Sequence, residues 1–504
     1  VGSMLTLVLA DNLLFLYLGW EGVGLCSYLL IGFWYKEADN VRAALKAFIV
    51  TRIGDAALAV GFFLIFYNLG TLSIQSAAGL ASQKWLAGSL VANAAAALVL
   101  AGALGKSAQL PLQTWLPDAM AGPTPVSALI HASTMVTAGV YLIARTHTFF
   151  VLAPPVQNAV AIIGAVTLLM AGSSAIAQRD IKRVLAYSTM SQVGYMFLAL
   201  GIGAWAASIF HFMVHAFFKA LLFLGAGLVI KSLDNEHDIF RMGGIRQRLP
   251  FVFWTFLIGS ASLAAVPFVT GGFYSKDLIL FQAWINPLGG MSLFLAGLIG
   301  SFLTSVYIFR LFFIVFTGEA KRKIEPAKSR IAGISLAILA ILSIIGGYVE
   351  VPPFLGNITF FTDFMKPALP EAAKVTKGTD AFFIVLMLSI AASLGGIYAA
   401  YALFVRNRAF TEKLVNTAPG NIIHRFSFSG WGFDHAYDVL IVRPLAYLAM
   451  KGRRDFFDLF FHSIEFLCRG IFRILRITQM GNLHWYAAAI AFGAIVFIGL
   501  VIFS

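Results

Sequence analysis

Long apolar segments, separated by short polar ones, run through most of the chain. A membrane-spanning helix needs about 20 mostly apolar residues, and these segments reach that length. The pattern therefore predicts an all-α polytopic membrane protein of about twelve complete spans and one fragment. We place the fragment at 3–10 and the complete spans at 13–34, 47–69, 89–110, 125–144, 156–177, 184–203, 206–230, 251–269, 291–316, 331–349, 381–405 and 486–503.

The segment at 431–482 follows a different pattern. Charged and polar residues recur there at steps of three and four, and large apolar residues fill the opposite face. Its charges forbid a span, so we predict a long lateral amphipathic helix on the membrane surface, followed by a terminal transmembrane helix at 483–504. A rod of roughly 50 to 60 Å, if unbroken, suggests contact with neighbouring subunits.

Composition and charge agree with a membrane protein. Hydrophobic residues make up 60% of the 504 positions and charged residues only 12%. The net charge of +13 is not spread evenly, because the basic residues collect on one set of alternate loops. By the positive-inside rule those loops face the cytoplasm, so basicity reports orientation and not a nucleic-acid partner.

The chain offers no pattern for a bound cofactor. It has no G-x-G-x-x-G, Walker or CxxCH motif, and its two cysteines, Cys26 and Cys468, lie far apart. We therefore expect no redox cofactor and no metal in this chain, and an energy source in a gradient or a partner. The chain opens at Val1 inside an apolar run, so we also expect it to be truncated at its N-terminus.

Ionisable residues lie inside the predicted spans, where they are costly and usually functional. The most informative is Lys106, in the middle of the apolar run 89–110. A chain with so many buried charges is expected to carry charge across the membrane. The candidate residues in or beside the spans are Glu21, Arg52, Asp55, Lys106, His131, His211, His215, Lys219, Lys276 and Asp277.

Two halves of the chain resemble one another at an offset of 170 positions, which aligns Lys106 with Lys276. Glycines and prolines beside each lysine predict a helix break. An odd number of spans separates equivalent points, so the halves should be inverted repeats, as in many transporters. Short matches between apolar segments also arise by chance, but a recurring buried lysine favours a true repeat. We divide the chain into a first antiporter-like repeat at 1–145, a second at 146–317, additional spans and loops at 318–430, and the two C-terminal segments.

Glu21 and Lys106 are the first candidates for proton transfer. Burial favours the neutral forms of both, and pairing restores both charges, so such a pair can exchange protons. If Glu21 moves away, Lys106 loses its counter-charge and its affinity for a proton falls. Arg52 and Asp55, three positions apart, are expected to form an intrahelical ion pair that tunes this region.

A relay of further groups is expected to follow. His211, His215 and Lys219 lie four apart, so they share one face of a helix. Together with His131 they would lead to Lys276, beside which Asp277 would be a local counter-ion. A lone histidine such as His131 can equally be only a hydrogen-bond partner between helices.

Metal binding by His211 and His215 is a weaker alternative. Their spacing suits two ligands on one helix face, but no third ligand or HExxH pattern accompanies them. The relay is therefore the favoured reading of these histidines.

Several long segments of the chain resemble the L subunits of bacterial respiratory complex I, the proton-pumping NADH:quinone oxidoreductase. The resemblance covers almost the whole chain and is carried by ADNLLFLYLGWEGVGLCSYLLIGFW, KAFIVTRIGDA, GKSAQLPLQTWLPDAMAGPTPVSALIHASTMVTAGVYLIAR, RDIKRVLAYSTMSQVGYMFLALG, HFMVHAFFKALLF and GGFYSKD. It implies roles for the buried residues: Glu21 and Lys106 as the glutamate–lysine pair, Arg52 and Asp55 as the adjacent ion pair, His131, His211, His215 and Lys219 as the central axis, and Lys276 as the terminal lysine.

The resemblance also implies a setting. The chain would be a non-redox subunit of the enzyme's membrane arm in the bacterial inner membrane, translocating protons. FMN, iron–sulfur clusters and quinone would be held by partner subunits, and the lateral helix would contact the neighbouring antiporter-like subunits. The M and N subunits are rival assignments, but they lack that helix. The M subunit also resembles the chain less because it carries a glutamate where Lys276 stands.

Two other classes of function stay open. The large subunit of multisubunit sodium/proton antiporters has a similar core but no redox partner. A purely structural subunit would leave the buried lysines unexplained.

Overall fold

The computed structural model describes residues 1–325, 330–352, 355–371, 379–451, 456–478 and 481–503. The chain divides into two compact units, Val1–Phe433 and Asp434–Ser504. The first unit is almost entirely helical, and its one described sheet pairs the short antiparallel strands β1 (Glu350–Val351) and β2 (Ile358–Thr359).

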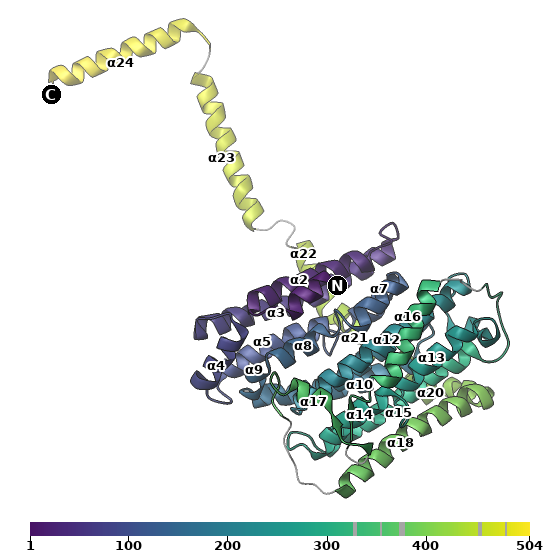
Figure 1. The fold of residues 1–504 in the computed structure, drawn as a ribbon. Helices are drawn as coiled ribbons and strands as arrows, with labels where there is room; N and C mark the ends of the chain where they lie inside the picture. The colour runs from purple at the N-terminus through teal and green to yellow at the C-terminus, as the bar shows by residue number, and fades with distance from the viewer. Residues whose placement is uncertain (326–329, 353–354, 372–378, 452–455, 479–480, 504) are drawn as a thin grey trace. The chain divides into compact units, whose positions relative to one another are not determined.

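The helices of the first unit run side by side in a bundle, in which α2 and α3 lie along one side and α18 along the opposite side (Figure 1). In chain order the helical segments are α1 (Gly2–Val8), α2 (Leu13–Ile31), α3 (Ala38–Leu69), α4 (Ile74–Lys84), α5 (Leu90–Lys106), α6 (Trp115–Asp118), η1 (Ala119–Ala121), α7 (Thr124–Ala132), α8 (Ala138–Arg145), α9 (His147–Val151), α10 (Pro154–Ala177), α11 (Ile181–Gly201), α12 (Trp205–Ser232), η2 (Ile239–Arg241), η3 (Ile245–Gln247), α13 (Pro250–Leu263), α14 (Gly271–Ile285), α15 (Met291–Phe316), α16 (Arg330–Ile345), α17 (Phe360–Met365), α18 (Thr379–Tyr401), the π-helical η5 (Ala402–Arg406), α19 (Arg408–Asn416) and α20 (Ala418–Phe428).

Seven described helices are long and apolar enough to cross a membrane, which confirms a helical membrane protein. Shorter apolar helices accompany them at α5, α13 and α16. The continuous span expected at 125–144 is wrong, because the chain leaves the helix between α7 and α8. That interruption begins after Ala132, the last residue of α7 and the neighbour of His131.

Two helix breaks lie where glycines and prolines predict them. Helix α5 ends at Lys106 and the chain resumes helix only at Trp115, while α13 ends at Leu263 and α14 begins at Gly271. Lys106 is the last residue before its break, whereas Lys276 lies within α14, after its break. The offset of 170 positions therefore aligns the two lysines but not the ends of their helices.

Small residues and polar caps explain how the helices pack around these breaks. A side-chain carbon on Gly54 of α3 would lie 2.7 Å from the Ala101 carbonyl of α5, so glycine permits the close approach of these two helices. The side chains of Asn12 and Asp180 accept hydrogen bonds from the first backbone N–H groups of α2 and α11. Such caps place the helix ends where the short polar linkers begin.

Helix α11 lies at the core of the bundle. It contacts α10, α12, α14 and α15, and every one of its residues except Arg183 is buried. Polar side chains on such a helix face other helices and not lipid, so they are available for an internal polar path.

The second unit holds the C-terminal helices. After α21 (Phe433–Tyr437), at the boundary, come the π-helical η6 (Asp438–Val442), α22 (Arg443–Lys451), α23 (Phe456–Thr478) and α24 (Leu483–Phe503). The amphipathic helix expected at 431–482 is thus helical in pieces, with 452–455 and 479–480 outside the described residues. The expected terminal transmembrane helix corresponds to α24. The domain boundaries at 145, 317 and 430 stay predictions.

Candidate functional site

Lys106 forms a buried ion pair with Asp55. The Lys106 side chain is 1% exposed and its Nζ lies 3.0 Å from Oδ2 of Asp55, which is 2% exposed. Trp20 Nε1 donates a hydrogen bond of 2.6 Å to the other carboxylate oxygen of Asp55. Burying two charges is favourable only where the partners and the remaining lone pairs are satisfied, as they are here. Helices α2, α3 and α5 therefore build one polar site.

Glu21 pairs with a different cation. Its Oε2 lies 2.7 Å from Arg52 Nη1, and the side chains are 21% and 46% exposed. The expected pairs are thus exchanged: Glu21 with Lys106 and Arg52 with Asp55 are both wrong as direct ion pairs in this structure. The reason is burial, because the deeply buried lysine requires the equally buried carboxylate of Asp55 on the facing side of α3.

Gly24 nevertheless brings helix α2 against the lysine. A side-chain carbon at Gly24 would lie 2.5 Å from Lys106 Nζ. Gly24 is one turn from Glu21 on the same helix, so the amine lies close to the stretch of backbone that carries Glu21. The sequence correctly associates α2 with Lys106, although the direct counter-ion comes from α3.

The three titratable residues of α12 are completely buried, with exposed fractions of 0% for His211, His215 and Lys219. Lys219 Nζ donates to Ser188 Oγ at 2.7 Å, and Ser188 Oγ lies 2.9 Å from the hydroxyl of Tyr307. His215 Nδ1 lies 3.2 Å from the carbonyl oxygen of Ala132. These contacts join α12 to α11, α15 and the end of α7.

His131 lies next to that junction. Its ring is tilted against Phe223 of α12 at 5.6 Å between centroids. Neither ring nitrogen has a hydrogen-bond partner among the described residues. Buried polar atoms that protein groups leave unpaired are typical binding positions of ordered water. His131 is thus not the simple interhelical hydrogen-bond partner of the alternative interpretation.

Lys276 lies at the far end of this polar series. His211 Nδ1 is 2.9 Å from Ser275 Oγ, and Lys276 Nζ donates to the Leu263 carbonyl at 2.9 Å. Leu263 is the last residue of α13, so the amine satisfies a terminal carbonyl at the negative end of a helix dipole. No carboxylate of the described residues lies within ion-pair distance of Lys276.

Asp277 is therefore not a direct ion-pair partner of Lys276. Adjacent positions on a helix point in different directions, so the Lys276 amine points away from Asp277. Its charge still acts on Lys276 over a longer distance.

Several polar residues of the site were missed by the sequence reasoning. Ser188 and Tyr195 on α11, Ser275 on α14 and Tyr307 on α15 all lie on the series, and Tyr195 places its ring 5.3 Å from Lys276 Nζ. One signal in the sequence could have indicated Ser188 and Tyr195, namely the polar run STMSQVGY inside a predicted span. In the structure that span, α11, is buried on all sides.

Lys182, in the first turn of α11, is a further buried cation. It is 2% exposed and donates to the carbonyls of Met120 and Gly122 at 2.5 and 2.6 Å. Lys182 lines a cavity of about 800 Å³ at the end of the bundle that carries the basic loops. In that cavity Asp118 pairs with both Lys46 and Arg183 at 2.6 Å. The cavity is thus lined by charged side chains of both signs.

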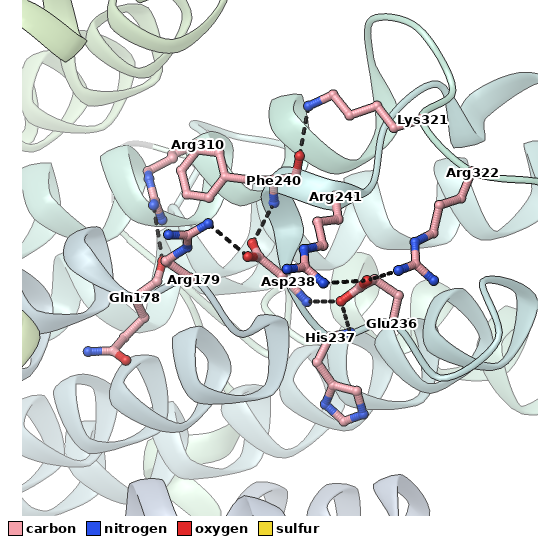
Figure 2. A network of polar contacts seen from close by, with 10 residues as sticks. All are labelled: Gln178, Arg179, Glu236, His237, Asp238, Phe240, Arg241, Arg310, Lys321 and Arg322. Carbon is pink, nitrogen blue, oxygen red and sulfur yellow. Dashed lines mark hydrogen bonds and ion pairs between the residues drawn. The ribbon is translucent and has the colours of Figure 1, made fainter.

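Ion pairs also tie the loop after α12 to its neighbours (Figure 2). Asp238 pairs with Arg179 at 2.9 Å, and Glu236 pairs with Arg322 at 2.7 Å. Beside them, burial tends to raise the pKa of Asp180, but hydrogen bonds from His237 and from the backbone of Arg183 and Lys182 hold that pKa below its usual value. These contacts fix the rim of the polar cavity.

Comparison with known proteins agrees with this architecture. Residues 10–304 match the family model described as NADH:quinone oxidoreductase/Mrp antiporter, TM. The chain is 51% identical over 504 residues to NADH-quinone oxidoreductase subunit L of Pseudomonas aeruginosa, covering 100% of this chain and 80% of that protein. It is 48% identical over 501 residues to the protein of that name in Escherichia coli strain K12, covering 99% and 79%.

More distant proteins share the fold. The chain is 39% identical over 523 residues to NADH-ubiquinone oxidoreductase chain 5 of Marchantia polymorpha, covering 99% of this chain and 78% of that protein. A chain of the Mrp complex from Dietzia sp. DQ12-45-1b superimposes with a TM-score of 0.70 at 24% identity, covering 99% of this chain and 50% of that one. A chain of the archaeal membrane-bound sulfane sulfur reductase gives a TM-score of 0.62 at 26% identity, covering 78% and 75%.

Proposed function

The chain belongs to the family of NADH-quinone oxidoreductase L subunits, and on that premise we propose that it moves protons through its buried polar series. The redox chemistry that drives this movement takes place in partner subunits, which hold the FMN, iron–sulfur clusters and quinone. The lateral helix contacts neighbouring antiporter-like subunits of the bacterial inner membrane. The observation that carries the proposal is the buried Lys106–Asp55 pair beside the Glu21–Arg52 pair.

Four charges in this arrangement can form two alternative sets of pairs. In one set Lys106 is neutralised by Asp55 and Glu21 by Arg52, as in this structure. In the other, Glu21 turns to Lys106, whose amine already touches α2 at Gly24. Lys106 has one carboxylate partner in each complete set, so the free energy of holding a proton there changes only during the exchange, while neither carboxylate is paired with it. A redox-driven shift of α2 or α3 would thereby let Lys106 bind and release a proton.

The remaining groups provide a route on either side of Lys219. His131 lies within electrostatic reach of both Lys182, which lines the polar cavity, and Lys219. From Lys219 the series continues through His215 and His211 to Ser275 and Lys276. Water at the unpaired ring nitrogens would complete the connections between groups that do not touch.

The test compares Lys106→Ala with the control Lys84→Ala, which changes an exposed lysine at the end of α4. Both variants are assembled into the complete enzyme, and NADH oxidation with quinone is measured together with proton uptake. We expect Lys106→Ala to lower the number of protons taken up per NADH, and Lys84→Ala to leave it unchanged. Unchanged coupling in Lys106→Ala would reject the relay.

A sodium/proton antiporter subunit is the competing function. The likeness to the Mrp complex concerns the fold, whereas the identity of about one half to subunit L proteins extends over the whole chain. Purification of the native protein separates the two functions. Recovery without an NADH-oxidising arm would show the antiporter assignment to be the right one.

A further inference from the structure

Arg310 of α15 is a buried cation that the proton series does not use. The residue is 3% exposed, and its guanidinium lies against the rings of Phe240 and Phe404, at 5.4 Å from each centroid. Nη2 donates to the Gln178 carbonyl at 3.0 Å (Figure 2). Nε and Nη1 have no hydrogen-bond partner among the described residues. An arginine buried this deeply without an anion is costly, so the two unpaired nitrogens indicate a missing acceptor.

The neighbouring carboxylates already have other partners. Asp238 pairs with Arg179 at 2.9 Å, and Glu412 pairs with Arg408 at 3.1 Å. His424 of α20 faces the same region and feels the positive charge of Arg310 and Arg179. The surroundings of Arg310 therefore carry an excess of positive charge.

Arg310 lines an apolar cavity of about 790 Å³, formed where α10, α15, η5, α19 and α20 meet. Most of the other lining side chains are apolar, among them Ile176, Ile314, Leu403 and Ile423. Thr411 and the Arg408–Glu412 ion pair also line the cavity. The cavity thus joins one unneutralised guanidinium to apolar walls in a membrane protein.

We propose that this cavity binds one anionic phospholipid of the surrounding bilayer. Its phosphate accepts hydrogen bonds from Nε and Nη1 of Arg310, since a guanidinium matches two phosphate oxygens at once. Its acyl chains lie along the apolar walls. Basic pockets between membrane helices bind anionic headgroups in this way. The lipid would fasten α19 and α20 to α10 and α15, a role independent of proton transfer.

Two variants test the headgroup and the chain separately. Arg310→Gln removes the charge, and Ile423→Trp narrows the cavity at a residue that is 65% exposed and so tolerates substitution. Ile422→Trp is the matched control for size, because Ile422 is 69% exposed and does not line the cavity. Arg246→Gln is the control for charge, since Arg246 stacks on Phe253 away from this site.

The assembled complex is purified in detergent, stripped of loosely held lipid and examined by native mass spectrometry. It is then titrated with phosphatidylglycerol, with phosphatidylcholine and with inorganic phosphate. We expect both test variants to lose one tightly retained anionic phospholipid. Arg310→Gln should bind phosphatidylglycerol about tenfold more weakly, the loss expected for a hydrogen bond to a charged group. The two controls should retain it, and phosphatidylcholine should not replace it.

Other outcomes would overturn the proposal. Retention of the same lipid by Ile423→Trp would place it elsewhere, even if Arg310→Gln fails to assemble. Occupancy by inorganic phosphate at the affinity of phosphatidylglycerol would mean an anion site without a lipid. A carboxylate of a neighbouring subunit on Arg310 in the assembled complex would assign the site to a protein contact.

Discussion

Lys106 and Lys276 are two buried amines at two helix breaks, and the bundle neutralises them differently. Lys106 has a carboxylate on the next helix, with Asp55 at 3.0 Å. Lys276 has a backbone carbonyl at the end of its own broken helix, with Leu263 at 2.9 Å. The first neutralisation depends on side chains that can exchange partners. The second is built into the backbone and stays constant.

This difference suggests different tasks for the two amines. A lysine whose counter-ion can change alters its proton affinity when the partner moves, which suits a switch. A lysine at a helix C-terminus experiences a fixed dipole, which suits a constant step of a path. We therefore expect the loss of a charge to slow proton uptake most around Lys106, and the loss of a hydroxyl partner to slow it more around Lys276.

The largest contrast is expected between Asp55→Asn and Asp277→Asn. The first leaves Lys106 without its buried counter-ion, and breaking such a pair typically destabilises by about 3–5 kcal/mol. The second removes a carboxylate that makes no direct ion pair with Lys276, so we expect about 1 kcal/mol or less. The thermal unfolding midpoint and the proton uptake of the assembled enzyme measure both effects. Equal losses in the two variants would contradict the comparison.

Gly24→Ala perturbs the first site without changing any charge. The new carbon would lie 2.5 Å from Lys106 Nζ, so the amine has to move and its contact with Asp55 weakens. We expect about 1–3 kcal/mol of destabilisation, as for other overpacked sites, and reduced proton uptake. Gly22→Ala is the control on the same helix, because its new carbon meets only the Ser3 side chain, with Oγ at 3.0 Å and Cβ at 3.1 Å. A neutral result at Gly24 would mean that the amine is mobile there.

The sequence predicts the helical membrane fold and the residues of this comparison, but not their partners. Apolar length and the Gly and Pro positions locate the breaks after Lys106 and before Gly271. The choice of Asp55 over Glu21 depends on which side of α3 faces α5, which a close glycine contact at Gly54 decides. Ser275 and Tyr307 were missed because hydroxyl residues are common in membrane helices and acquire meaning only from their neighbours.

Ser275→Ala tests the second site. It removes the hydroxyl that lies 2.9 Å from His211 Nδ1, and the loss of one such hydrogen bond costs about 1 kcal/mol. We expect normal assembly and a severalfold slower proton uptake, because His211 loses the contact that joins it to the helix of Lys276. Ser335→Ala, which alters a partly exposed serine bonded only within α16, is the control. An unaffected rate would remove Ser275 from the path.

The smallest effect is expected from substituting histidines outside the spans, where the measured quantity is the pH dependence of stability. Burial, Arg310 and Arg179 lower the pKa of His424, whereas His237 has a carboxylate, with Asp180 Oδ2 at 3.3 Å. An unfolded histidine binds a proton below about pH 6.5, and the folded chain with its lowered pKa resists doing so. The contribution of His424 to the free energy of unfolding is therefore fully present above that pH. It is lost as the pH falls toward the pKa of the folded state.

His424→Gln should flatten the decrease of the thermal unfolding midpoint between about pH 7.5 and 5.5, because glutamine does not titrate. His237→Gln is the matched control, because it replaces a histidine whose Nδ1 lies 3.3 Å from Asp180 Oδ2 instead of beside arginines. The change should be small and should shrink further in high salt, because solvent screens a partly exposed group. An unchanged pH profile in His424→Gln would mean that the two arginines do not act on this histidine. The contrast between sites with and without a carboxylate partner would then apply only to the residues within the membrane.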